Sequence, residues 1–300
     1  MKTQRGLSYK EFQKKFGSNE QCLVFLSEQK WGKGYHCLQC NSQEYRQGKR
    51  KLNRRCKQCG YEESPTSNTL FHKLKFDLYK AFGMIYEIML SKKGANSILL
   101  AERYEVSQNT AWLFRRKVQQ YLKSSNNHPL TGEVHVDEFE IGTPQKNQQG
   151  RSATTQKVRV VLACEIRGNQ VGNMYSQVIT DFSAKSLKPI FDAHISTQAF
   201  VKTDGWTGYK PLKQLYKNLT QELSNQGKNF PEIHIQIRNI KNWLRGTHSF
   251  CGAQNLQDYL NEYSYRFNRR SQRTTIITKL LHRFLWMKSP TFKQLNLLTT

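Results

Sequence analysis

A short acidic stretch inside an otherwise basic chain is the first candidate for chemistry. Residues 134–141, Val-His-Val-Asp-Glu-Phe-Glu-Ile, alternate apolar and polar positions as a β-strand does, with a change of phase at the acids. A carboxylate in the middle of such a strand is costly to bury unless it is paired or binds a metal ion. We therefore predict that Asp137 is the first carboxylate of a divalent-metal site that acts on nucleic-acid phosphates.

A second acid, Asp204, follows a short predicted strand at residues 199–203 and opens the sequence Asp-Gly-Trp-Thr-Gly-Tyr. An aspartate before a glycine is common in turns, so Asp204 taken alone fits a turn as well as it fits a metal site. If Asp137 and Asp204 lay together, they could bridge one or two Mg²⁺ ions for an in-line displacement at phosphorus.

The elements predicted around these acids would bring them together. A polar, Gln-rich loop at 144–156 follows the first strand, and further elements follow the loop: a hairpin of strands at 158–166 and 171–179, a helix at 182–195, the strand that ends before Asp204, and a helix at 212–225. This order is typical of an RNase H-like fold, an α/β architecture with a mixed sheet flanked by helices. Adjacent central strands of that fold can place two carboxylates side by side.

Four cysteines upstream form two matched pairs, Cys37-Leu-Gln-Cys40 and Cys56-Lys-Gln-Cys59. Two CxxC pairs at this separation predict a four-thiolate Zn²⁺ site, and four protein ligands leave no open position, so we expect the zinc to be structural. Residues 48–55, between the pairs, carry five Lys or Arg residues. They could contact phosphates or form a solvated basic hairpin.

Three helices are predicted next, at 76–90, 96–104 and 107–122. A short link with Ser107 as N-cap joins the last two, as in a helix-turn-helix, whose second helix enters the major groove of DNA. We expect DNA contacts from the polar and basic side chains of this second helix: Gln108, Asn109, Thr110, Arg115 and Arg116. The alternative is an ordinary helical linker whose basic face is solvated.

The composition favours a polyanionic partner. The chain has 300 residues, with 47 Lys and Arg against 22 Asp and Glu, and a formal net charge of +25. Such an excess predicts nucleic-acid binding, although a ribosomal or generally adhesive basic protein would share it. We find no apolar run that could span a bilayer and no signal peptide, so we expect a cytoplasmic protein with no membrane partner. Its seven cysteines are then expected to be thiols or metal ligands.

These features predict three domains. A zinc ribbon with N-terminal helices occupies residues 1–70, a helix-turn-helix DNA-binding domain residues 71–125, and an RNase H-like catalytic domain residues 132–290. The polar stretch 124–132 marks the last boundary. An apolar tail from about residue 274 is expected to form a closing helix against the sheet.

The chain resembles a bacterial insertion-sequence transposase of the DDE type, from the group with a zinc ribbon and an ISXO2-like catalytic domain. The four paired cysteines and the segments 134–138, 203–209, 243–248 and 259–270 carry the resemblance, and they are specific together although each is weak alone. The resemblance implies cleavage at the ends of a DNA element and strand transfer by the freed 3′-hydroxyl into target DNA. It also implies a homo-oligomer assembled on paired ends.

The resemblance further implies a third metal ligand, usually Glu, with a Lys seven residues later. Counting back from the block at 243–248 places that Lys at Lys241, a candidate phosphate clamp, and the ligand position at His234. A neutral imidazole can bind Mg²⁺ or Mn²⁺, and nitrogen suits Mn²⁺ better. Glu232, two positions away on the same face of a predicted strand, and Glu262, on the following helix, remain rivals.

Other cations near these blocks, Arg245, Arg269 and Arg270, are expected to lie on the DNA backbone. Two alternative functions stay open. A non-catalytic DNA-binding regulator derived from a transposase would keep the zinc ribbon and helix-turn-helix but would need no acids on its strands. A nuclease of the same fold would cut DNA without joining it. The presence of Asp137 and Asp204 argues against the regulator.

Overall fold

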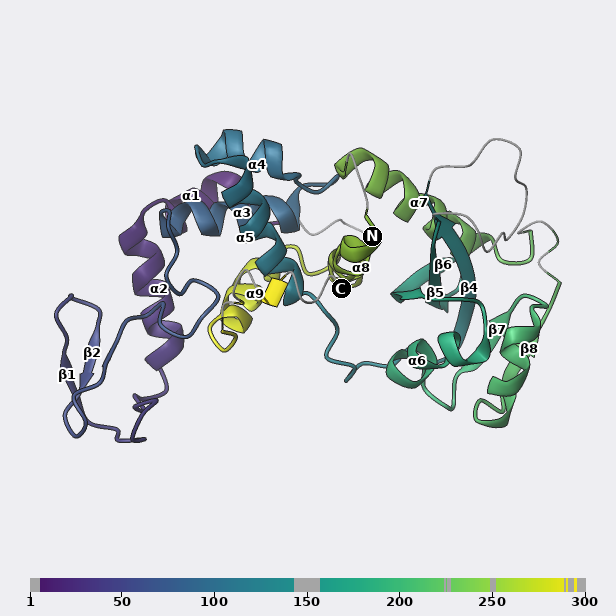
Figure 1. Ribbon diagram of the computed structural model, residues 1–300, viewed down its shortest axis with the longest axis horizontal. Helices are drawn as coiled ribbons and strands as arrows, with labels where there is room; N and C mark the ends of the chain where they lie inside the picture. The colour runs from purple at the N-terminus through teal and green to yellow at the C-terminus, as the bar shows by residue number, and fades with distance from the viewer. Residues whose placement is uncertain are drawn as a thin grey trace. The chain divides into compact units, whose positions relative to one another are not determined.

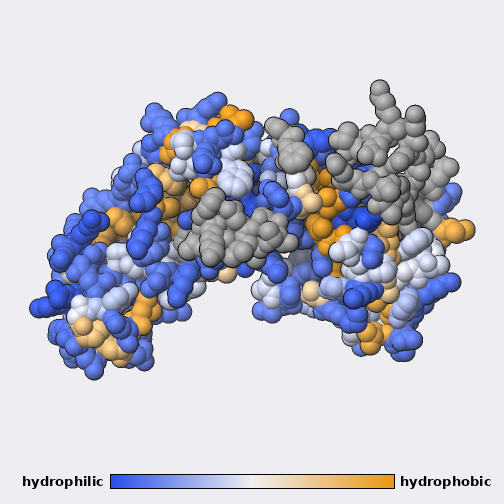
Figure 2. All heavy atoms as spheres, in the orientation of Figure 1, coloured by the Kyte–Doolittle hydropathy of each residue, from blue (hydrophilic) through white to orange (hydrophobic). Residues whose placement is uncertain are grey.

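The computed structural model describes residues 6–142, 157–223, 225, 228–248, 252–288, 290 and 294–295 (Figure 1). Two compact units are found: residues 1–121 with 271–300, and residues 122–270. The Gln-rich loop predicted at 144–156 lies outside the described residues. No helix in the described ranges is long and apolar enough to cross a membrane. Hydrophilic residues cover most of the described surface in view (Figure 2), as expected for a strongly charged chain.

The first unit begins with two short helices and a small sheet. Its elements are α1 (Tyr9–Phe16), α2 (Asn19–Trp31), β1 (Tyr45–Gln47), β2 (Arg54–Cys56) and β3 (Glu62–Glu63). Each helix starts with a capping box, in which Ser8 or Ser18 accepts a backbone N–H and the side chain three residues later bonds back to the cap. The strands pair antiparallel in the order β1-β2-β3. Because this sheet accompanies the four paired cysteines, the predicted zinc ribbon is confirmed.

Three helices follow in the same unit: α3 (Leu78–Leu90), α4 (Ser97–Tyr104) and α5 (Gln108–Gln120). Glu105 ends α4 in the left-handed conformation, with φ of 50°. Ser107 then caps α5 by accepting the backbone N–H of Thr110 at 3.2 Å. The short turn between two capped helices confirms the helix-turn-helix.

The tail helix α9 (Ile276–Phe284) also belongs to the first unit. The backbone N–H of Leu70 donates to the carbonyl of Phe284 at 3.1 Å, and the rings of Phe71 and Phe284 are 6.2 Å apart. The prediction that this tail closes the catalytic sheet is therefore wrong. An apolar stripe along a helix shows which face is buried, but not which core receives it.

A five-stranded mixed sheet in the order β6-β5-β4-β7-β8 forms the centre of the second unit (Figure 1). Its strands are β4 (Glu133–Ile141), β5 (Val158–Arg167), β6 (Gln170–Ile179), β7 (Phe200–Thr203) and β8 (Leu219–Gln221). β4 pairs antiparallel with β5 and parallel with β7. The β5–β6 hairpin turns at Gly168, whose φ of 60° favours glycine. This topology confirms the predicted RNase H-like sheet.

Helices cover both faces of the sheet. On one face lie α6 (Ala184–His194) and the 3-10 helix η1 (Thr207–Gln214), in one apolar cluster with Val134 and Val136. On the other lie α7 (Pro231–Thr247) and α8 (Ala253–Asn268), in a second cluster with Phe139. The change of phase seen along β4 in the sequence thus matches a strand that contributes to two cores.

Two predicted elements are wrong. Residues 212–225, expected to be a helix, contain the end of η1 and the strand β8, whose Leu219 pairs with Val201 of β7. Pairing at the sheet edge outweighs the local helical pattern. Residues 232–234, expected in a strand, lie in the first turn of α7, which begins at Pro231, a favoured residue at that position because it needs no hydrogen-bond partner for an N–H.

Candidate active site

Asp137 and Asp204 lie side by side because β4 and β7 are parallel neighbours. The register pairs Val136 with Thr203, the last residue of β7, so the next positions along the two strands are the two aspartates. Carboxylate oxygens of Asp137, Glu138 and Asp204 lie within 4.8 Å of one another. The structure therefore brings the two predicted acids together and adds a third.

Local hydrogen bonds orient the two aspartates. The backbone N–H of Glu138 donates to Oδ1 of Asp137 at 2.8 Å, and that of Trp206 donates to Oδ1 of Asp204 at 3.0 Å. The side-chain amide of Gln221 donates to the backbone carbonyls of Asp204 at 3.1 Å and Trp206 at 2.8 Å. β8 thereby holds the loop that carries Asp204.

Glu138 is the acid that sequence reasoning did not single out. It is 8% exposed. Burial, together with the charges of Glu138, Asp137 and Asp204, raises the pKa of the buried Tyr209 on η1 well above its ordinary value, so that phenol keeps its proton beside the acids. Alternation along a strand predicts opposite faces for neighbouring residues, so no sequence pattern shows that Glu138 joins Asp137.

His234 approaches this carboxylate cluster from α7. Its Nε2 atom lies 3.6 Å from Oδ2 of Asp137, and its ring is 40% exposed. Two ligands that each bind one metal ion at about 2.1 Å and at right angles are about 3 Å apart. The observed distance fits a shared ion after a small adjustment. The imidazole is nevertheless not one of the three groups within 4.8 Å of one another.

Neither rival ligand joins that group of three among the described residues. On a helix that turns about 100° per residue, Glu232 and His234 lie on opposite flanks. Glu232 lines a pocket of about 290 Å³ with Ile235 and Gln236. Placing both residues on one strand face is therefore wrong. Glu262 on α8 is fully buried, with its carboxylate 3.7 Å from the guanidinium of Arg266.

Lys241 lies on the same flank of α7 as His234. Its ammonium is 5.4 Å from the centre of the Phe139 ring, two residues beyond Asp137 on β4. The pKa of Lys241 is lowered below its ordinary value, by burial first and then by the neighbouring Arg245. The charges of Glu140 and Asp137 oppose this shift without cancelling it. A cation close to the carboxylate cluster is thus present at the position expected for a phosphate clamp.

The predicted recognition helix is only partly exposed. Gln108 and Asn109 are exposed and Thr110 is half-buried at the start of α5. Arg115 and Arg116 are 4% and 2% exposed, because the helical period turns them toward the core. The structure therefore does not present these two arginines to DNA, contrary to the prediction.

The cations at the end of α8 make contacts within the protein. The guanidinium of Arg270 donates to the backbone carbonyls of Val171 at 2.6 Å and Gly172 at 2.8 Å, and it stacks 4.1 Å from the Phe267 ring centre. The guanidinium of Arg269 lies 3.8 Å from the ring centre of Tyr265. The hydrogen bonds of Arg270 join the end of α8 to β6, so the predicted role of Arg270 on DNA competes with a structural one.

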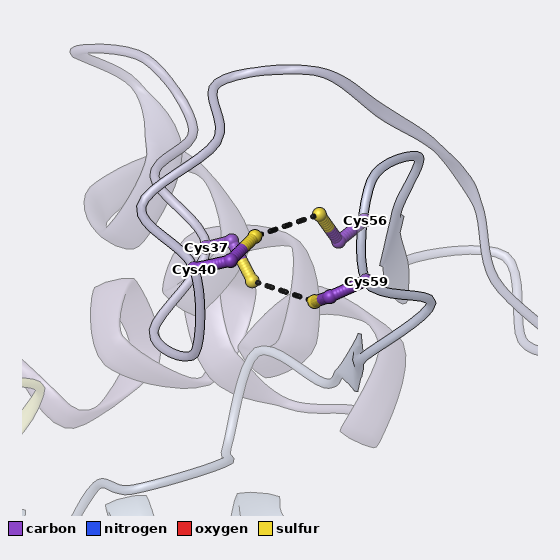
Figure 3. Close-up of side chains that lie close together, drawn as sticks. All are labelled: Cys37, Cys40, Cys56 and Cys59. Carbon is purple, nitrogen blue, oxygen red and sulfur yellow. Dashed lines mark hydrogen bonds between the residues drawn. The ribbon is translucent and has the colours of Figure 1, made fainter.

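The four paired cysteines converge in the first unit (Figure 3). The sulfurs of Cys37 and Cys59 are 3.5 Å apart, as are those of Cys40 and Cys56. A tetrahedral zinc ion with Zn–S bonds of about 2.3 Å separates its sulfurs by about 3.8 Å, so the arrangement fits. The backbone N–H of Cys59 lowers the pKa of Cys56 to about 6, which favours the thiolate at that residue, whereas hydrogen bonds with the other cysteine sulfurs raise the pKa of Cys40.

One cation of the basic hairpin at 48–55 is packed beside this cluster. The Arg54 guanidinium lies 4.5 Å from the ring centre of Trp31 and 4.2 Å from that of Tyr45. Such cation–π contacts stabilise the packing of α2 against the zinc ribbon. Arg54 is thus a structural residue, which leaves Lys49, Arg50 and Lys51 as the exposed cations of the hairpin.

Comparison with protein families matches residues 129–268 to the ISXO2-like transposase domain. Comparison with curated proteins finds no match. Among solved structures, a chain of the "Crystal structure of a pre-cleavage Mos1 transpososome" aligns with 13% identity and a TM-score of 0.29, over 68% of this chain and 76% of that chain. This likeness is too low to support an inference. The family match spans Asp137, Asp204 and His234.

Proposed function

We propose that this protein is a DNA transposase that cuts strands at the ends of a mobile element and joins the freed 3′-hydroxyl to target DNA. The observation that carries the proposal is the pair Asp137 and Asp204, held together on neighbouring strands inside a domain of the transposase family. Two carboxylates at this separation suit divalent-metal phosphoryl transfer.

Asp137 and Asp204 would hold Mg²⁺ or Mn²⁺, with His234 as the third ligand. Bound ions would activate the attacking oxygen and stabilise the leaving one. The 3.6 Å approach of His234 to Asp137 supports its role. Glu138 is the alternative third ligand because its carboxylate lies within 4.8 Å of both aspartates.

The remaining chemistry of the site is electrostatic. Backbone N–H groups hold one oxygen of each aspartate, which limits the rotation of both carboxylates before any substrate arrives. Lys241 and Arg245 on α7 would neutralise phosphates of the bound strand, which the acids alone would repel.

The first unit would recognise DNA. The four cysteines would hold a structural Zn²⁺, and Gln108, Asn109 and Thr110 would enter the major groove from the exposed start of α5. Action on two element ends would require a homo-oligomer. Inverted repeats in the DNA on either side of the gene would supply those ends.

The test is strand cleavage and joining on a labelled duplex taken from DNA beside the gene, with Mg²⁺ or Mn²⁺. Wild type should give cut and joined products, and Asp137→Asn should give neither. Lys217→Gln, at an exposed cation of the second unit, is the matched control and should act as wild type. Cleavage without joining would favour a nuclease. Binding of a duplex with inverted-repeat ends, without cleavage in any reaction, would favour the regulator.

A further inference from the structure

One flank of α7 carries four nitrogen-bearing side chains in a row. The residues are His234, Arg238, Lys241 and Arg245, spaced four, three and four apart. At about 100° per residue they fall within an arc of about 60°. The buried side of the helix is formed by other residues, Ile233, Ile237, Ile240 and Leu244. We call these four residues the α7 stripe. Arg238 is its one member to which sequence reasoning assigned no role.

The stripe starts at the carboxylate cluster. His234 lies 3.6 Å from Asp137 through Nε2 and Oδ2. Two turns later the Lys241 ammonium lies against Phe139 of β4. A molecule bound along the stripe would therefore pass directly beside the two aspartates.

Arg238 and Arg245 are exposed, and neither guanidinium has a hydrogen bond or ion pair with another described residue. Several other cations of the second unit do have acidic partners, for example Lys202 with Glu133 at 2.9 Å and Arg167 with Glu165 at 2.8 Å. Cations that lack such partners beside a group of acids are suited to an anionic ligand.

We propose that Arg238, Lys241 and Arg245 form a track that holds about three consecutive phosphates of the DNA strand beside the carboxylate cluster. Seven residues of helix, from 238 to 245, rise about 10 Å. Phosphates of one strand of B-DNA advance about 3.4 Å each along the axis, so this length covers about three intervals between phosphates, and each of the three cations can face a different phosphate. The proposal rests on the proposed function in one respect, that the substrate is DNA.

The proposal gives Arg238 a specific role. It contacts a phosphate between those nearest His234 and Lys241, and it fixes the direction in which the strand crosses the site. Because the contact is with the backbone, it should not depend on the DNA sequence. Its contribution should appear in the salt dependence of binding, where each phosphate contact adds about 0.9 to the slope of log affinity against log salt.

The test measures binding of the full-length protein to labelled duplex DNA by fluorescence anisotropy, without added Mg²⁺ or Mn²⁺, between 50 and 200 mM salt. Arg238→Gln should lower the slope by about 0.9, so that affinity falls about 3.5-fold less over this range than in wild type. Arg238→Lys keeps the charge and should keep the slope. Lys217→Gln, which removes an exposed cation of the same unit away from α7, should also keep it.

An unchanged slope in Arg238→Gln would overturn the proposal, and so would an equal loss in Lys217→Gln, which would show only general attraction. If the binding slopes of wild type and Arg238→Gln differ as expected but wild type never cleaves DNA, the proposed transposase activity is refuted and the phosphate track is not. If wild type cleaves DNA but the slope of Arg238→Gln is unchanged, the phosphate track is refuted and the proposed transposase activity is not. Wild type that binds no duplex at any salt concentration would overturn both.

Discussion

Replacing Asp204 by Asn should make the metal-free protein more stable and remove its stabilisation by Mn²⁺. Asp204 lies within 4.8 Å of two other carboxylates, and like charges at this separation repel. Asparagine has the same shape and keeps an oxygen to accept the N–H of Trp206, now at 3.0 Å. The substitution therefore removes one negative charge and little else.

The size of the effect follows from the separation. At an effective dielectric constant of about 20, two unit charges 4.8 Å apart repel by about 3.5 kcal/mol. Asp204 takes part in two such pairs, but Asp137 and Asp204 are both partly exposed and water screens them, so we expect a gain of about 2 kcal/mol. For a unit of this size that corresponds to about 4–8 °C in melting temperature.

The assay is thermal unfolding of wild type and Asp204→Asn with no divalent ion and with Mn²⁺. Wild type should gain about 1.4 kcal/mol when Mn²⁺ is at ten times its Kd, and the variant should gain almost nothing. Asp192→Asn is the control, because Asp192 belongs to an exposed pair with Lys188 on α6. It should leave the Mn²⁺ effect intact. An Asp204→Asn protein that is less stable without metal, or that still responds fully to Mn²⁺, would refute the metal cluster.

Three further predictions concern other parts of the protein. Removal of zinc, or Cys56→Ser, should abolish hydrogen-exchange protection at residues 35–63 while Cys22→Ala keeps it; protection that survives zinc removal would argue against the site. Burial, with Lys123 nearby, lowers the pKa of His194 to about 4 from 6.5, so below pH 6.5 the unfolded chain binds a proton that the folded protein does not. The free energy of unfolding should therefore fall as pH drops toward 4, by about 1 kcal/mol between pH 7 and 5 after allowance for partial exposure, and His194→Gln should reduce this fall in urea titrations. Finally, His234→Ala should lower Mn²⁺-supported cleavage about 10-fold or more; if Glu138→Gln does so and His234→Ala does not, Glu138 is the third ligand.

Local spacing was enough to predict several features of this protein. Two CxxC pairs are a pattern of sequence spacing, which predicts a metal site without knowledge of the tertiary structure. Ser107 between two helical patterns marks a capped turn. Asp137 could be found because an acid on an apolar strand contradicts its surroundings. Its partner Asp204 could be paired with it only through the expected order of strands, which the parallel register of β4 and β7 bears out.

The errors arise where a local pattern fits two structures. Residues 232–237 read Glu-Ile-His-Ile-Gln-Ile, a strict alternation that predicts a strand, yet they form a helix that buries Ile233 and Ile237 and leaves Ile235 44% exposed. Pro231 was the signal for a helix start. The burial of Arg115 and Arg116, and the union of Glu138 with Asp137, depend on packing between distant elements, which one sequence does not display.

The central claim is that the carboxylate cluster joins DNA strands. The most direct measurement offers the protein a pre-cut duplex end with a free 3′-hydroxyl and a circular target DNA, with Mg²⁺ or Mn²⁺, and scores covalent joining. We predict joined product from wild type, none without divalent metal, and none from Asp137→Asn or Asp204→Asn. Joining by either variant at the wild-type level, or wild type that cuts the same end but never joins it, would contradict the account.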